Sequence, residues 1–143
     1  MLAVAMAAGF VIAALAQSDP APLDSGYVVA LHLVSLHDKP CCQILTPGVS
    51  VRSQSSGYMM GTLDNSTGER SYFAGRMFET DDKHWALGFG MITGYKRATV
   101  LPFITPSVHF DLGDDYGARF SILPRSHSTG ADAIHFMLEK TLK

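Results

Sequence analysis

The sequence is poor in charge and in cysteine. Charged residues make up only 17% of the 143 residues, and the formal net charge is −2. This excludes the basic surface on which proteins bind nucleic acid, so no nucleic-acid partner is predicted. The two cysteines, Cys41 and Cys42, are neighbours in the chain, and neighbouring cysteines rarely form an unstrained disulfide. No further Cys or His pair follows at zinc-binding spacing, so we interpret both as small apolar loop residues and predict neither a metal nor a cofactor.

Long hydrophobic runs are also missing. The longest apolar stretch, 1–16, is shorter than the roughly 20 residues that a membrane-spanning helix needs. It is uncharged and ends in Ala14-Leu-Ala16, a small-x-small pattern that is typical of a secretory signal peptide. Residues 17–25 hold two prolines and two aspartates and are predicted to be a linker. The remaining domain, 26–143, can therefore cross a membrane only as a β-barrel.

No long amphipathic helical period appears in this domain, whose length fits a single unit. Clusters of Ser, Asp and Gly instead divide it into about eight extended segments. These segments are expected at 26–36, 45–53, 57–63, 70–79, 84–93, 99–111, 116–123 and 131–140.

Large apolar residues alternate with small or polar ones in the later segments, and in 84–93 they are Trp85, Leu87, Phe89 and Met91. In a soluble sandwich or lipocalin-like barrel such a face would be the core. In an outer-membrane barrel it would face lipid, and the small and polar face would fill the lumen. The even strand number, the short turns and the export signal favour the second interpretation. We therefore predict an all-β fold, an eight-stranded antiparallel up-and-down β-barrel of the outer-membrane type.

This topology brings a histidine and a serine to one end of the barrel. If the N-terminus is periplasmic, alternate connections lie on the outer rim. His32 lies on the first strand, which runs toward that rim, and Ser66 lies in the turn after the third strand. An exported His and Ser that face the outer leaflet favour acyl chemistry on lipid. The connections expected on this rim are 37–44, 64–69, 94–98 and 124–130.

Several short motifs follow one another at characteristic spacing. They are Ala30-Leu-His32, Leu63-Asp-Asn-Ser66, Phe73-Ala-Gly75, Lys83-His-Trp-Ala-Leu-Gly-Phe-Gly90, Leu101-Pro-Phe-Ile-Thr-Pro106, Tyr116-Gly and Ile122-Leu-Pro124. With these motifs the chain from Tyr27 to Glu139 resembles the outer-membrane lipid A palmitoyltransferase (PagP) family. The resemblance implies a monomeric barrel in the Gram-negative outer membrane, after signal-peptide cleavage. It implies acyl transfer from phospholipid to lipid A, which are then the partners.

The resemblance also assigns roles to residues. The family's catalytic His matches His32 and its Ser matches Ser66. The family's Asp, directly before the Ser, is replaced by Asn65, which orients an imidazole without offsetting its charge. Asp64 lies one residue earlier, and a turn here would swing it inward. A Gly at the floor of the family's acyl pocket is replaced by Met77, which implies an acyl chain shorter than palmitate.

Three residues on one strand face and four prolines are further candidates for lipid contact, although arginines of that face would more commonly pair with Glu or Asp in the lumen. Arg70, Tyr72 and Arg76 share a strand face and are candidates for binding lipid A phosphates. Proline cannot donate a hydrogen bond to a strand ladder, so prolines in or beside strands predict gaps in the barrel wall. The resemblance implies that lipid tails enter through such gaps. The prolines concerned are Pro47, Pro102, Pro106 and Pro124.

Other functions remain open from the sequence. Ser107 and His109 lie two residues apart and share a face, so they form a second candidate for acyl chemistry. The replacement of Asp by Asn65 favours a non-catalytic small outer-membrane barrel of bacterial or phage origin. A soluble lipocalin-like binder would require the apolar face to point inward.

Overall fold

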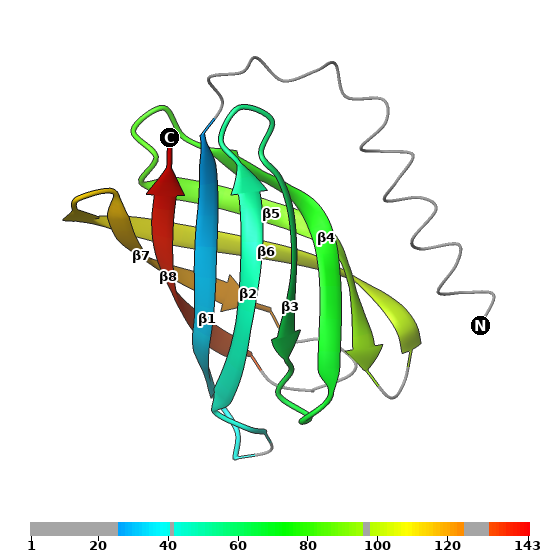
Figure 1. Cartoon of the computed structure of the whole chain (residues 1–143). Coiled ribbons are helices and arrows are strands. Elements are labelled where there is room, and N and C mark those ends of the chain that lie inside the picture. The colour runs from blue at the N-terminus through cyan, green and yellow to red at the C-terminus, as the bar shows by residue number, and fades with distance from the viewer. Residues whose placement is uncertain (1–25, 41, 96–97, 125–131) are drawn as a thin grey trace.

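The computed structural model describes residues 26–40, 42–95, 98–124 and 132–143. The chain forms a closed barrel of eight antiparallel strands, in which β1 pairs with β8, as Figure 1 shows. This confirms the predicted fold, while the predicted signal peptide and linker lie outside the described residues. The strands are β1 (Tyr27–His37), β2 (Leu45–Ser53), β3 (Tyr58–Asp64), β4 (Arg70–Glu79), β5 (Trp85–Tyr95), β6 (Ala98–Gly113), β7 (Tyr116–Leu123) and β8 (Ala133–Leu142).

In the described ranges no helix has the length and the apolar character to span a membrane.

The two ends of the barrel differ in their connections. The turns β2–β3, β4–β5 and β6–β7 lie at the end where β1 begins and β8 ends, which we call the terminal end (Figure 1). The connections β1–β2, β3–β4, β5–β6 and β7–β8 lie at the opposite end, which we call the loop end. The predicted grouping of these four connections on one rim is thus confirmed.

The outer surface of the barrel is apolar. Trp85 and Phe89, which alternation places on one face, are 60% and 43% exposed and point outward. β1, β3, β5 and β7 each begin with an exposed aromatic residue at the terminal end. A ring of aromatic side chains at the end of the strands therefore borders the apolar surface. The ring residues are Tyr27, Tyr58, Trp85 and Tyr116.

The interior of the barrel is polar, which reverses the usual arrangement of a soluble protein. Among the described residues more polar than apolar side chains are buried, and the largest fully buried side chain is that of Arg119. Aromatic rings also occupy the lumen where the neighbouring strand carries a glycine as the direct cross-strand partner. A Cβ on Gly61 would lie 2.8 Å from Phe73 Cζ, and one on Gly90 would lie 2.9 Å from Phe103 Cε1. The buried polar side chains are His32, Ser35, Thr46, Arg52, Asn65, Ser66, Ser71, Thr105, Ser107, Arg119, Ser121, His135 and Glu139.

A bulge in β1 changes which residues face the lumen. The register of β1 against both β2 and β8 shifts between His32 and Val34. As a result, His32 and Ser35 are both buried, although they are three residues apart. Strict two-residue alternation would have turned Ser35 outward, because successive side chains of a regular strand point to opposite faces.

The prolines of β6 lie where its pairing with β7 has ended, whereas the pairing of β6 with β5 continues through Pro102 and Pro106. The pairing of β6 with β7 covers β6 only from Ser107 to Gly113 and stops at Pro106. The Thr105 hydroxyl donates to the Ile122 carbonyl oxygen at 3.0 Å, where a proline nitrogen has no hydrogen to offer. Pro102 also lies in the part of β6 that has no β7 partner within the described chain. We call this interval, β6 98–106, the β6 seam.

The prediction for the cysteines requires a correction. Cys42 is disulfide-bonded, so the cysteine side chain in the β1–β2 connection is not simply a small apolar loop residue.

Replacing Gly75 by alanine is expected to destabilise the barrel by about 1–3 kcal/mol, the usual cost of overpacking. An added Cβ would overlap the backbone carbonyl oxygen of Phe89, which cannot move without shifting β5. Urea unfolding in micelles, followed by the fluorescence of the single tryptophan Trp85, measures the loss. Gly88→Ala is the control, since its Cβ would meet the side chains of Thr105 and Met59 at 3.0 and 3.4 Å and the Thr105 carbonyl oxygen only at an ordinary contact distance of 3.6 Å. Equal stability of the two variants would contradict this expectation.

Candidate functional site

A chain of hydrogen bonds joins five polar side chains inside the barrel. His32 lies in its middle, with Nε2 2.9 Å from Ser50 Oγ and Nδ1 2.7 Å from His135 Nε2. On the far side, His135 Nδ1 is 2.8 Å from Ser35 Oγ, which lies 3.1 Å from Thr46 Oγ1. We call these five residues the histidine array.

The histidine array has a consistent direction of hydrogen bonding. A neutral imidazole has one N–H donor and one acceptor nitrogen. If His32 Nε2 accepts the Ser50 hydroxyl hydrogen, its Nδ1–H donates to His135 Nε2. His135 Nδ1–H then donates to Ser35, whose hydroxyl donates to Thr46. In this direction each donor from Ser50 to Ser35 has an acceptor, and the Ser50 oxygen is polarised toward attack.

Closure of the barrel and the bulge in β1 assemble the array. His135 on β8 pairs directly with Ser35 on β1, and both face the lumen because of the bulge. On the other side, Gly48 lies opposite His32 on β2 and carries no side chain. Ser50, two residues along the same face of β2, can therefore reach the ring as a diagonal neighbour.

An aromatic ring covers the array. Phe73 on β4 meets His32 edge-on, with 5.6 Å between ring centroids, and it also meets Phe103 edge-on at 6.2 Å. His32 is only 4% exposed. The imidazole of His32 is thus shielded from water, which strengthens its hydrogen bonds.

The serine that contacts His32 is Ser50, and not Ser66, which the sequence motif assigned to this role. Ser66 lies at the loop end of the barrel. The Ser66 hydroxyl bonds to the Tyr95 phenol at the loop end, and the Ser66 carbonyl oxygen accepts the Gln43 N–H at 2.9 Å. Both ring nitrogens of His32 are occupied by Ser50 and His135. The motif Leu63-Asp-Asn-Ser66 therefore belongs to the β3–β4 turn at the loop end and not to the surroundings of His32.

Asn65 and Asp64 organise the β3–β4 turn. The Asn65 amide nitrogen donates to Ser71 Oγ and to the Gly94 carbonyl oxygen, both at 2.9 Å. Its carbonyl oxygen accepts the Thr67 N–H at 2.9 Å, the Thr67 hydroxyl at 2.7 Å and the Glu69 N–H at 3.2 Å. This amide has no capacity left to orient His32 or an oxyanion. Asp64 instead forms an ion pair with Arg70 at 2.8 Å, at the end of the strand pair.

The three predicted substrate-binding residues point to different sides of β4. Tyr72 is exposed on the outer surface, and the Arg76 guanidinium lies over the rings of Tyr58 and Phe78, with centroid distances of 5.2 and 4.8 Å. Met77 is buried in the lumen near the terminal end. Arg76 and Tyr72 therefore share a face, as predicted, and Met77 lies on the other.

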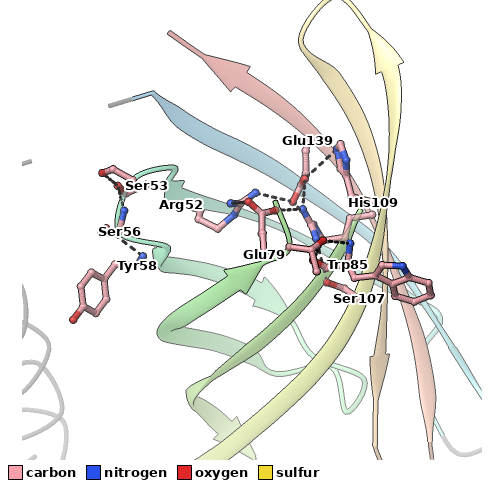
Figure 2. Close-up of polar contacts among 12 residues, drawn as sticks. Arg52, Ser53, Ser56, Tyr58, Glu79, Trp85, Ser107, His109 and Glu139 are labelled. Atoms are coloured by element: carbon pink, nitrogen blue, oxygen red, sulfur yellow. Dashed lines mark hydrogen bonds and ion pairs between the residues drawn. The ribbon is translucent and has the colours of Figure 1, made fainter. Parts of the chain in front are cut away.

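A second polar cluster crosses the lumen between the array and the terminal end. Arg119 Nη2 donates to Glu79 Oε1 at 2.6 Å, and its Nε donates to Glu139 Oε1 at 2.8 Å. Arg52 Nη1 donates to Glu79 Oε2 at 2.7 Å and its Nη2 lies 3.9 Å from Glu139 Oε1. Figure 2 shows side chains of opposite walls of the barrel meeting here. We call Arg52, Glu79, Arg119 and Glu139 the charge cluster.

The alternative pair Ser107 and His109 belongs to the surroundings of the charge cluster. Ser107 Oγ accepts Arg119 Nη1 at 3.2 Å, and His109 Nε2 lies 3.6 Å from Glu139 Oε2 (Figure 2). The two residues share a face, as predicted, but each contacts a different member of the cluster. Their geometry supports contacts that hold the charge cluster in place rather than a serine–histidine dyad.

Ser50, His135 and Ser35 are the functional candidates that sequence reasoning missed. Ser50 and His135 lie at alternating lumen positions of the strands that flank β1 in a closed barrel. A search for polar residues on the lumen faces of the second and last strands would have found both. Ser35 has no such signal, because the bulge that turns it inward leaves no mark in the alternation.

Metal binding finds no support in the described part of the chain, where no group of three or more His, Cys, Asp or Glu side chains is placed to hold an ion. A comparison with protein-family models finds no match, and a comparison with curated proteins finds none either.

Proposed function

We propose that this chain is an outer-membrane barrel of a Gram-negative bacterium. The inverted distribution of side chains supports this location most strongly. Trp85, Phe89 and other large apolar residues cover the outside, while arginine, glutamate and histidine are buried inside. An apolar band bordered by aromatic residues is the lipid-facing surface of such barrels. A soluble lipocalin-like binder would expose the polar face instead.

The two ends of the barrel support an orientation in this membrane. Outer-membrane barrels have short periplasmic turns and longer extracellular loops. The terminal end carries tight turns, such as the one between Gly113 and Tyr116, whereas the connection from Leu123 to Ala133 at the loop end is longer. The terminal end is therefore the periplasmic side, and the loop end faces outward.

Within this barrel we propose that the histidine array transfers an acyl chain from a phospholipid to lipid A. The observation that carries this proposal is the contact of Ser50 Oγ with His32 Nε2, backed by His135 on Nδ1. Nucleophile, base and orienting group in series are the arrangement that activates a serine. The order of motifs shared with the palmitoyltransferase family adds support for this substrate class.

The proposed reaction has two acyl-transfer steps. As Ser50 Oγ attacks the ester carbonyl of the phospholipid, His32 Nε2 takes the hydroxyl proton. The ester C–O bond breaks, His32 returns the proton to the departing oxygen, and an acyl-serine and a lysophospholipid result. A lipid A hydroxyl then attacks the acyl-serine, with His32 accepting its proton and returning it to Ser50 Oγ. His135 holds the tautomer of His32 throughout both steps.

The β6 seam supports entry of the acyl chain from the side. We take the β6 seam, which has no β7 partner within the described chain, as the place where lipid enters, because prolines in a strand leave its ladder without hydrogen-bond donors. From there a row of lumen positions leads to the array, because Ser107 pairs with Ser121 and Ser121 pairs with His135. In this reaction Phe73 must rotate off His32 when the acyl chain enters.

A non-catalytic barrel is the second candidate function. It is favoured by the Phe73 ring, which covers the histidine array. Both nitrogens of His32 are satisfied and Phe73 closes the ring from the lumen. In this alternative the array only ties β1 to β2 and β8.

His32→Ala is expected to abolish an added acyl chain on lipid A without removing the protein from the membrane. The full-length chain and the variant are expressed in a Gram-negative host that lacks its own transferase. Fractionation reports the location, and mass spectrometry of lipid A reports acylation. An acyl addition that persists in His32→Ala refutes the catalytic role of the array. Absence of any addition with the unaltered chain favours the non-catalytic barrel, and recovery in the aqueous fraction refutes the membrane location.

A further inference from the structure

A cavity of about 350 Å³ lies at the terminal end of the barrel, around the β2–β3 and β4–β5 turns. Its inner side is formed by Arg52 and Glu79 of the charge cluster, and its outer side by Arg76 and Phe78. Lys83, in the β4–β5 turn, lies at its edge. The cavity therefore joins the charged lumen to the apolar outer surface. We call it the rim pocket.

The rim pocket has an excess of positive charge. Arg52 and Glu79 neutralise each other through their ion pair at 2.7 Å. The charged groups that remain are the cations of Arg76 and Lys83 and the carboxylate of Asp81. Within the described chain no ion pair joins any of these three side chains to another residue. Among the side chains that line the pocket, one positive charge is thus left uncompensated.

Arg76 is held in a position that leaves its outer nitrogens available. Its Nε donates to the Ser56 carbonyl oxygen at 2.8 Å, which directs the side chain toward the end of the barrel. No hydrogen bond to either Nη atom is present within the described residues. Arg70, the other arginine on the outer face of β4, differs because it is paired with Asp64.

Aromatic residues surround Arg76 on the lipid-facing wall. Tyr58 on β3 and Phe89 on β5 are its direct cross-strand partners, and Phe78 follows two residues later on β4. Phe78 and Phe89 stack with 5.6 Å between their ring centroids. An arginine facing lipid is unfavourable unless it lies near the interface and finds an anion. Three aromatic rings beside it form an apolar surface on which acyl chains can lie.

The β4–β5 turn keeps Lys83 at the edge of the pocket. Asp82 accepts the Thr80 hydroxyl hydrogen and the His84 N–H, the latter at 3.0 Å, and these bonds hold the pKa of the Asp82 carboxyl below its usual value. Thr80 Oγ1 also accepts the Trp85 N–H at 3.1 Å. The turn is therefore closed by its own side chains, and within the described residues the Lys83 ammonium has no hydrogen-bond or ion-pair partner.

We propose that the rim pocket binds the phosphate of a phospholipid from the periplasmic leaflet, through the Arg76 Nη groups and the Lys83 ammonium. The acyl chains lie along Tyr58, Phe78 and Phe89. This rests on the membrane location and orientation proposed above, but not on acyl transfer. Lipid A occupies the opposite leaflet, so the position of Arg76 replaces the expectation that this residue binds lipid A phosphates.

Native mass spectrometry of the full-length protein in detergent, titrated with phosphatidylglycerol, tests the site. We expect one retained lipid per chain, and a loss of about tenfold or more in its affinity in Arg76→Gln, because charge-assisted hydrogen bonds to phosphate are lost. Lys83→Gln is expected to weaken binding less. Arg70→Gln, on the same face of β4, is the matched control and should bind normally. Diacylglycerol, which has the same chains without the phosphate, should not be retained.

Each outcome of this experiment tests a different part of the proposal. Equal binding by Arg76→Gln and the unaltered chain would overturn the site. Displacement of the lipid by millimolar inorganic phosphate would show a site for a free anion and overturn the lipid assignment. Lipid retention without any lipid A acylation would leave the rim pocket standing and refute only the acyl transfer. Mobility on gels without boiling confirms that each variant is folded, and fractionation tests the membrane location separately.

Discussion

Replacing Arg119 by methionine is expected to destabilise the barrel by about 3–5 kcal/mol, the cost of breaking a buried ion pair by removing one partner. Arg119 is fully buried and joins Glu79 and Glu139 across the lumen. Without it two carboxylates and the Ser107 hydroxyl lose a charged partner in an interior that water reaches poorly. Urea unfolding in detergent micelles, followed by Trp85 fluorescence, measures the loss.

Arg70→Met is the matched control for this experiment. Its ion pair with Asp64 has the same chemistry, with 2.8 Å between the charged atoms, but Arg70 is half exposed. Exposed ion pairs contribute about 0–1 kcal/mol to stability, so the free energy of unfolding of this variant should be close to that of the unaltered protein. Adding Glu139→Gln to Arg119→Met should recover part of the stability, because one unpaired charge disappears. A loss of less than 1 kcal/mol in Arg119→Met would show that Arg52 alone neutralises both carboxylates.

Ser50→Ala is expected to lower acyl transfer to lipid A by about 100- to 10,000-fold, the range for losing a group that acts with a general base. Ser50 Oγ is the hydroxyl within hydrogen-bonding distance of His32 Nε2, at 2.9 Å. The fold should persist, since Ser50 is only half-buried and the substitution leaves no charge unpaired. The measurement is the rate of acyl transfer by purified protein in detergent, with phospholipid as donor and lipid A as acceptor.

Ser66→Ala is the matched variant. It distinguishes Ser50, which the structure places at His32, from Ser66, which the sequence motif assigned as the catalytic serine. Ser66 bonds to Tyr95 at the loop end and not to His32, so its loss should leave the transfer rate within a few-fold of the unaltered rate. A variant pair with the opposite result, in which Ser66→Ala is inactive and Ser50→Ala is active, would refute the histidine array. It would require the loop end to rearrange around His32 when substrate binds.

The charge cluster could not be predicted from its sequence positions. Arg52, Glu79, Arg119 and Glu139 are far apart in the chain and belong to four strands. Each is a polar residue at a lumen position, which alternation predicts for that strand alone. The ion pairs depend on which walls face each other across a narrow lumen, and that is set by the tilt and stagger of all eight strands together.

Local patterning determined the strands of this protein and the side of each strand that faces outward, because side chains alternate with a period of two wherever a strand is regular. The tertiary structure decided the partner of His32. A bulge broke the period between His32 and Val34, and the pairing of β1 with β8 placed His135 against the same ring. Both effects depend on contacts between distant residues, which no short stretch of sequence encodes. The motif at Asp64 to Ser66 therefore marked a turn, while the hydroxyl at His32 came from the neighbouring strand.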